Sequence, residues 1–242
     1  MHPIIAEFPS RRFYEGKIED AANILDLVGV DQCHWYSEPV FAPLVFFDVA
    51  DGAHTISFNS FINELEAAMV EAIVRALLRC YPGERWKEKI AVVTPYAEQV
   101  RLIRDKLKGV FGSAKPCPVE VNTVDGFQGR EKDCVIVSTV RAASKDDSIG
   151  FLRDGRRMNV TLTRARQNLW VVGNHETLGK NELWGDFLKF ASGHGYVQVR
   201  GNPAGVFSNC QVYNPADAWD GDEKSRLEDV QVIIDAEPEE IQ

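Results

Sequence analysis

Two polar runs of this sequence carry residue types that bind phosphate groups. The first is Thr123–Glu131, which precedes the apolar run Cys134–Val140. The second is Arg156–Arg166, which precedes the apolar run Leu169–Val172. Short apolar runs of this length are typical of buried strands. Each polar run is therefore expected to be fixed in space by a strand of the protein core.

The first run combines flexible backbone with charged and amide side chains. Gly126 and Gly129 permit tight turns and the close approach of a ligand to the backbone. Gln128 can both donate and accept hydrogen bonds. Arg130 or Glu131 alone would be an ordinary charged turn before a strand. The whole combination is more specific and indicates a ligand-binding loop.

The second run is rich in arginine, whose planar fork of donors suits phosphate. An arginine directed at a transferring γ-phosphoryl group accelerates its hydrolysis by about 10³–10⁵. Apolar residues interleave with the charges, so we expect a helix packed on a sheet rather than a solvated face. The arginines are Arg153, Arg156, Arg157, Arg164 and Arg166.

A third polar run, Thr94–Gln99, follows the apolar run Ile90–Val93. Thr94 can offer a hydroxyl and backbone N–H groups at a helix start, an arrangement that binds phosphate. The other interpretation is a plain helix cap with Pro95 in the first turn. The run alone does not decide between these two interpretations.

The order of apolar runs predicts an α/β fold with a mainly parallel sheet covered by helices on both faces. Ligands bind such sheets beyond the carboxyl ends of the strands, where we expect the three polar runs. The first 43 residues read as irregular, and residues 1–200 read as one domain followed by a tail, 201–242. The predicted strands are Leu44–Val49, Ile90–Val93, Val119–Val124, Cys134–Val140 and Leu169–Val172, and the predicted helices are Asn59–Cys80, Tyr96–Phe111, Arg156–Arg166 and Asn181–Ser192.

Charge and composition limit the functional classes. Residues 214–242 hold ten acidic and two basic side chains, so most of the net charge of −9 belongs to the tail. The acidity is therefore weak evidence against nucleic-acid binding by the domain. The sequence has no apolar stretch of about 18 residues, so we expect no membrane partner. Five widely spaced cysteines argue against a zinc site and against a disulfide framework, and no metal ligand is predicted.

These runs resemble known motifs. Thr123–Glu131 resembles motif V of the superfamily 1B RNA/DNA helicases, and Gly150–Arg166 resembles their motif VI. Thr94–Gln99 resembles the segment after their motif IV, and Met1–Gly16 resembles the stretch immediately downstream of their Gln-Tyr-Arg motif. The resemblance spans residues 1–200 and is strongest to the senataxin-like members.

The resemblance implies a second, C-terminal RecA-like domain of a P-loop-NTPase-type motor. In this family ATP and Mg²⁺ bind between two such domains, and single-stranded RNA or DNA lies across both. Members of the family typically translocate 5′-to-3′ along the strand. The senataxin-like resemblance favours a nuclear location over a cytoplasmic one. The expected partners are therefore a first RecA-like domain, in cis or in trans, and a single strand of nucleic acid.

The resemblance also assigns roles by position. Arg164 corresponds to the arginine finger that faces the γ-phosphate. The remaining nucleotide contacts implied are Gln128, Gly129, Arg130 and Glu131, with Glu131 on the sugar. The implied contacts to the nucleic-acid strand are Thr94, Tyr96 and Thr123.

A motor also needs parts that this sequence lacks. The phosphate-binding loop Gly-x-x-x-x-Gly-Lys-[Ser/Thr] is absent, and so is an Asp-Glu pair at a strand end for Mg²⁺. The segment Gly173–Asn181 has its glycines one residue too far apart and Asn181 where a hydroxyl is required. The Gln-Tyr-Arg motif would precede Met1. We therefore expect no ATP hydrolysis by this chain alone. The alternative is a non-catalytic nucleic-acid or partner-binding module derived from a helicase domain.

Overall fold

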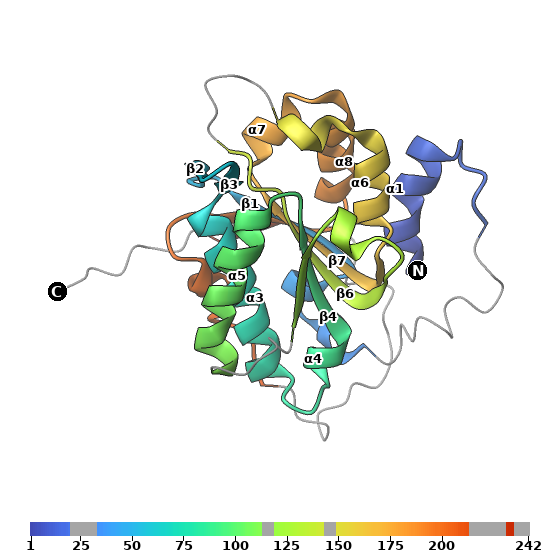
Figure 1. The fold of residues 1–242 in the computed structure, drawn as a ribbon. Helices are drawn as coiled ribbons and strands as arrows, with labels where there is room; N and C mark the ends of the chain where they lie inside the picture. The colour runs from blue at the N-terminus through green and yellow to red at the C-terminus, as the bar shows by residue number, and fades with distance from the viewer. Residues whose placement is uncertain (20–32, 113–118, 143–148, 213–230, 235–242) are drawn as a thin grey trace.

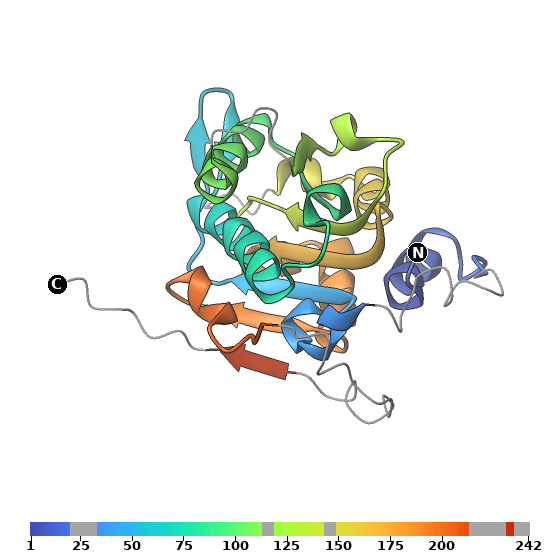
Figure 2. The ribbon, with the colours of Figure 1, turned by 90° about the horizontal axis from the view of Figure 1, so that it is seen from below.

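A seven-stranded parallel sheet organises the part of the chain that the computed structural model describes, which is residues 1–19, 33–112, 119–142, 149–212 and 231–234. Its strand order is β5-β4-β6-β7-β1-β8-β9, and every neighbouring pair is parallel. Figure 2 shows β1 lying between β7 and β8. The strands are β1 (Leu44–Val49), β4 (Ile90–Thr94), β5 (Glu120–Thr123), β6 (Lys132–Ser138), β7 (Ala165–Gly173), β8 (Tyr196–Val199) and β9 (Gln231–Ile234).

Helices cover both faces of this sheet, which confirms the predicted RecA-like α/β fold (Figure 1). One face carries α3 (Glu64–Cys80) and α5 (Ala97–Phe111). The opposite face carries α1 (Pro3–Phe13), α6 (Gly155–Leu162) and α8 (Glu182–Ser192), with the short α7 (His175–Gly179) beside α8. A further short helix, α4 (Trp86–Lys89), leads into β4.

Apolar side chains on both faces of the strands hold these layers together. Val45 and Phe47 of β1 belong to the core cluster under α3 and α5, whereas Leu44 and Phe46 belong to the cluster under α1, α6 and α8. The same alternation holds along β4, β6 and β7. Strands buried on both faces have continuous apolar sequences, so their runs were recognisable in the sequence.

The helix predicted from Asn59 begins later than expected. Asn63 is its N-cap and accepts a hydrogen bond from the backbone N–H of Glu66 at 3.1 Å. The preceding residues instead form an antiparallel hairpin of β2 (Thr55–Ser57) and β3 (Ser60–Ile62). The hairpin takes up the residues between the expected cap at Asn59 or Ser60 and the observed cap at Asn63.

The first 43 residues, predicted to be irregular, contain α1 and the short 3-10 helices η2 (His34–Ser37) and η3 (Pro39–Phe41). In α1, Pro3 occupies the first turn, where a missing N–H costs nothing. Pro9 lies inside the helix and removes one hydrogen bond. The helix forms nevertheless because Phe8 packs against Phe187 and Phe190 of α8, with ring centroids 5.3 and 5.7 Å apart.

Several other boundaries differ from the prediction, since β6 and β7 begin at Lys132 and Ala165 rather than at Cys134 and Leu169. Helix α6 ends at Leu162 rather than at residue 166, because β7 begins at Ala165. Beyond residue 200, the 3-10 helix η6 (Pro203–Phe207) buries Val206 and Phe207 in the core under α3. These first residues of the predicted tail are therefore packed against the domain. The acidic residues of 214–242 lie outside the described residues.

Candidate functional site

The predicted site residues lie at two opposite ends of the sheet. Thr94 and Thr123 end the parallel strands β4 and β5 and pair in register. Glu131 and Arg164 instead precede β6 and β7, whose first residues Lys132 and Ala165 are paired. In a parallel sheet, all strands begin on one side of the sheet and end on the opposite side. We call the side of the strand starts the amino edge and the side of the strand ends the carboxyl edge. The expectation that all three runs lie at the carboxyl edge is therefore wrong for these later residues.

At the amino edge, hydrogen bonds to the chain itself fix the direction of Arg164. Its Nε donates to the Val160 carbonyl at 2.8 Å, and its Nη1 donates to the Arg130 carbonyl at 3.3 Å. Its Nη2 donates to the Thr163 hydroxyl at 3.0 Å. A guanidinium has five N–H donors, and these bonds use three of them. The half-buried group is thus held in place while keeping donors for an anion.

The other residues implied to contact a nucleotide lie in the loop just before β6 and are exposed. Arg130 pairs with Glu120, and Glu131 accepts from Nε of Arg166 at 3.4 Å. Exposed ion pairs of this kind contribute about 0–1 kcal/mol, so a ligand can displace them at low cost. Gln128 and Gly129 complete the exposed loop. Gly129 has a φ of 78°, which favours glycine although an added Cβ would meet nothing within 4 Å.

At the carboxyl edge, two of the three implied nucleic-acid contacts are buried. Thr94 is 0% exposed and Tyr96 is 4% exposed. Among the described residues, neither hydroxyl has a hydrogen-bond partner. Burial raises the pKa of Tyr96 above its ordinary value. Thr123 is partly exposed, and its hydroxyl accepts from the Gly126 N–H at 3.1 Å. Of these three side chains, Thr123 is therefore the most accessible to a ligand at this edge.

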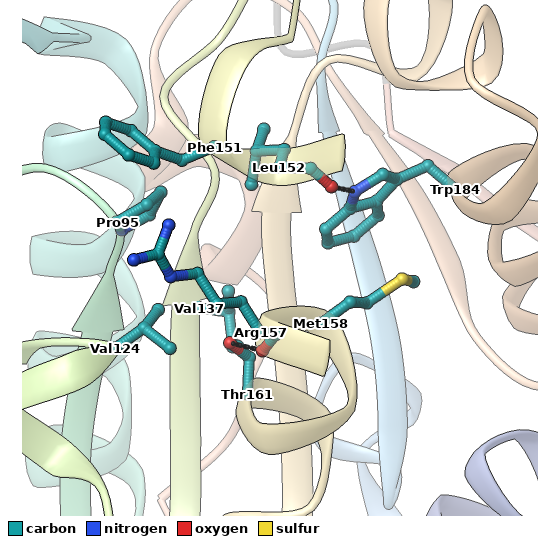
Figure 3. Close-up of a pocket in the computed structure, with 9 residues that line it drawn as sticks. All are labelled: Pro95, Val124, Val137, Phe151, Leu152, Arg157, Met158, Thr161 and Trp184. Carbon is teal, nitrogen blue, oxygen red and sulfur yellow. Dashed lines mark hydrogen bonds between the residues drawn. The ribbon is translucent and has the colours of Figure 1, made fainter. Parts of the chain in front are cut away.

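The 3-10 helix η5 (Gly150–Arg153) lies against Tyr96. A Cβ at Gly150, where φ is 56°, would stand 3.3 Å from the Tyr96 hydroxyl. Figure 3 shows Phe151 above the guanidinium of Arg157, beside Pro95. The apolar pocket that these residues line has a volume of about 20 Å³, which is room for about one water molecule. It is too small for a nucleotide or a base.

The first and second polar runs lie side by side and are joined at both ends. Near the carboxyl edge, Nε and Nη2 of Arg157 donate to the two carboxylate oxygens of Asp125 at 3.3 and 3.2 Å. Near the amino edge, Arg164 donates to the carbonyl of Arg130. Between these bonds Phe127 is fully buried in the core under α6. Sequence reasoning missed this connection because it joins residues 32 and 34 positions apart.

A buried polar network behind the carboxyl edge was also missed. The carboxylate of Glu66 accepts from the Ser138 hydroxyl at 2.7 Å and from the Val140 N–H at 2.8 Å. Gln99 donates to the same Ser138 hydroxyl at 3.1 Å. Burial raises the pKa of Glu66 to about 7, because the hydrogen bonds only partly offset the loss of hydration. In sequence Glu66 resembles an ordinary acidic residue of a first helical turn.

Comparison with known proteins decides the family. A family model described as an AAA domain matches residues 1–176, which is more than half of the chain. The chain belongs to this AAA domain family. It is 40% identical over 194 residues to the probable helicase MAGATAMA 3 of Arabidopsis thaliana, with 79% of this chain and 23% of that protein covered. It is 36% identical over 203 residues to the probable helicase senataxin of Mus musculus, with 84% of this chain and 7% of that protein covered.

The AAA domain match and these relatives identify the chain as a C-terminal RecA-like domain of the superfamily 1 helicases. The chain spans less than a quarter of the length of either relative. A solved structure, the C-terminal domain of a possible DNA helicase from Lactobacillus plantarum, aligns with a TM-score of 0.41 and 14% identity, over 72% of this chain and 85% of that one.

Two further properties concern the described residues only. None of their helices combines the length and apolar character needed to cross a membrane. No group of three or more His, Cys, Asp or Glu side chains among them is arranged to hold a metal ion.

Proposed function

We propose that this chain is the C-terminal motor half of an ATP-dependent 5′-to-3′ RNA/DNA helicase. In this role it presents an arginine finger to a nucleotide held by a first RecA-like domain and contacts the backbone of a single strand. The chain without that first domain is not an ATPase, because it has no phosphate-binding loop. A nuclear location goes with the senataxin-like family and belongs to the same proposal.

One observation carries this proposal: Arg164 is fixed by three hydrogen bonds beside Arg130 and Glu131 at an exposed edge. A domain that only bound nucleic acid would have no need of this arrangement, which is also apart from the carboxyl edge. The exposed residues fit one wall of a nucleotide site, with a cation for phosphate and a carboxylate for sugar hydroxyls. The residues that would hold the nucleotide are Gln128, Gly129, Arg130, Glu131 and Arg164.

Arg164 supplies the charge that this wall contributes to hydrolysis. ATP bound with Mg²⁺ supplies the γ-phosphoryl group that is transferred to water. Positive charge fixed in advance costs no reorganisation when negative charge develops on that group. The backbone bonds of Arg164 provide this fixation, and Glu131 would orient the nucleotide by its sugar.

The test is the variant Arg164→Ala in a protein that joins this chain to a first RecA-like domain. We expect a loss of about 10³-fold or more in ATP turnover, because the finger is removed. Binding of single-stranded oligonucleotide should be nearly unchanged, since Arg164 lies at the other edge of the sheet. Arg164→Lys should also be slow, because an ammonium cannot replace the planar fork.

Arg85→Ala is the matched control. Arg85 is an exposed arginine next to α4, paired only with the nearby Glu88 in the described part of the chain. It should keep wild-type turnover. Wild-type turnover in Arg164→Ala would remove Arg164 from the finger role. No turnover in the joined wild-type protein would instead favour the non-catalytic binding module. Unwinding of substrates with a 5′ or a 3′ overhang tests the direction.

A further inference from the structure

Phe151 is an exposed aromatic side chain at the carboxyl edge of the sheet. Phe151 is 57% exposed to solvent, which is unusual for a large apolar residue of a packed domain. The guanidinium of Arg157 lies 5.1 Å from its ring centroid. The Tyr96 ring meets it at 6.2 Å with an interplanar angle of 64°. The ring is thus supported by an arginine and a tyrosine while much of its surface faces solvent.

Phe151 belongs to a row of three aromatic side chains with an arginine at each end. The Tyr96 ring also contacts the Phe61 ring of the hairpin at 5.4 Å. The guanidinium of Arg141 lies 4.3 Å from the centroid of that same ring. The row therefore runs along the carboxyl edge from β3 to α6 and passes Tyr96. Rings supported by cations in this manner are typical of surfaces that bind single-stranded nucleic acid.

The charges around Phe151 favour a polyanion as its partner. Arg153 and Arg156 follow it closely in sequence and are exposed. Two acids near the ring are engaged within the described part of the chain, since Asp125 binds Arg157 and Asp154 accepts from the first N–H groups of α6. A phosphate backbone at this ring would therefore have the exposed Arg153 and Arg156 as cationic partners among the described residues. The pocket beneath the ring holds about 20 Å³, so a base cannot insert under it and has to stack on the exposed surface.

We propose that Phe151 is a stacking platform for a base of the bound single strand, supported from below by Arg157. The proposal rests on the proposed function and adds a specific contact to it. Stacking on an aromatic side chain tolerates any base, because every base has a flat face. Phe151 would therefore hold the strand without reading its sequence, as a translocating motor requires.

The experiment measures binding of the full chain to two labelled oligomers of equal length, oligodeoxythymidylate and its abasic counterpart, by fluorescence anisotropy. Phe151→Leu removes the flat ring but keeps an apolar side chain over Tyr96. We expect it to weaken thymidylate binding by about 5- to 100-fold, the range for one stacked base. Abasic binding should not change. Phe151→Trp should restore thymidylate binding.

The matched control is Phe111→Leu. Phe111 is the last residue of α5, and the Nζ of Lys87 lies 5.9 Å from its ring centroid. This control should bind both oligomers as the wild type does. If Phe151→Leu binds thymidylate as tightly as the wild type, stacking is excluded while the proposed function stands. An equal loss on both oligomers also excludes stacking. If the wild type binds neither oligomer, this inference and nucleic-acid binding by the chain both fail.

If Phe151→Leu leaves thymidylate binding unchanged but weakens association with a first RecA-like domain, the exposed ring is a protein contact and the stacking proposal is wrong.

Discussion

Glu66 is a buried titratable residue behind the carboxyl edge. Its carboxylate is fully buried and joins α3 to the backbone after β6. That backbone includes Val140, a β-branched residue with a φ of 70°. Left-handed backbone at such a residue costs on the order of 1–3 kcal/mol. The hydrogen bond from the Val140 N–H to Glu66 is one of the contacts that hold this conformation.

The pKa of Glu66 gives a pH-dependent prediction. It is about 7 in the folded protein, above the ordinary value of 4.5. Between these values the folded state holds the proton that the unfolded state has released, so stability falls as pH rises from about 4.5 to 7. The loss is on the order of 3 kcal/mol and levels off above the folded pKa.

Glu66→Gln tests this, because the amide keeps an acceptor for the Val140 N–H but cannot titrate. Urea unfolding at about pH 5 and about pH 8 should show a smaller pH-dependent loss in the variant than in the wild type. An identical loss in both proteins would show that other groups cause it. Glu71→Gln is the control, because Glu71 pairs with Arg75 on the exposed side of α3.

At the scale of elements, α6 and the loop Asp125–Glu131 form one unit between the two edges. Arg157 lies in the first turn of α6, and Arg164 lies between the end of α6 at Leu162 and the start of β7. The Asp125–Arg157 pair is partly exposed, with side-chain accessibilities of 70% and 38%. Such a pair contributes about 1 kcal/mol or less to folding. We therefore expect the Asp125–Arg157 pair to align α6 with the loop Asp125–Glu131 rather than to stabilise the fold.

Asp125→Asn should separate these two roles. The amide is uncharged and cannot form the two-bond ion pair with Arg157. Because an exposed ion pair contributes little to stability, we expect an unfolding free energy within about 1 kcal/mol of the wild type. In the protein joined to a first RecA-like domain, stimulation of ATP turnover by single-stranded RNA should fall several-fold, while turnover without RNA changes little. Unchanged stimulation would mean that the pair does not connect the edges. Asp105→Asn, which removes an exposed pair with Lys108, is the control.

Elements were predictable from the sequence where one physical signal dominated. The strands at Leu44, Ile90 and Cys134 were recognised because both of their faces are buried, which leaves continuous apolar runs. Helix α1 was not, because Pro9 argues against a helix and only contacts with the distant α8 outweigh it. The hairpin before α3 was missed because each of its strands has only three residues.

For the whole molecule, the sequence indicated candidate site residues but not how they divide between the two ends of the strands. The resemblance placed Arg164 and Thr123 in one motor, and both positions lie within the residues that the AAA domain model matches. Their separation onto opposite edges depends on where the loop after β5 crosses the sheet. No local pattern records this crossing, because it is fixed by the buried Phe127 and by hydrogen bonds between distant segments. No local sequence pattern records the exposure of Phe151 either.

The division of the site predicts how the isolated chain behaves. In the proposed function, its amino edge supplies a finger and a sugar contact and the sequence has no phosphate-binding loop, so the purified chain should hydrolyse no ATP with or without RNA. A separately purified first RecA-like domain added at increasing concentration should restore turnover, and the restored rate should be lost with Arg164→Ala. Saturation with concentration is expected because the two halves must associate before Arg164 meets the nucleotide. Hydrolysis by the isolated chain, with the same loss in the Arg164 variant, would mean that it holds phosphates by residues other than a phosphate-binding loop.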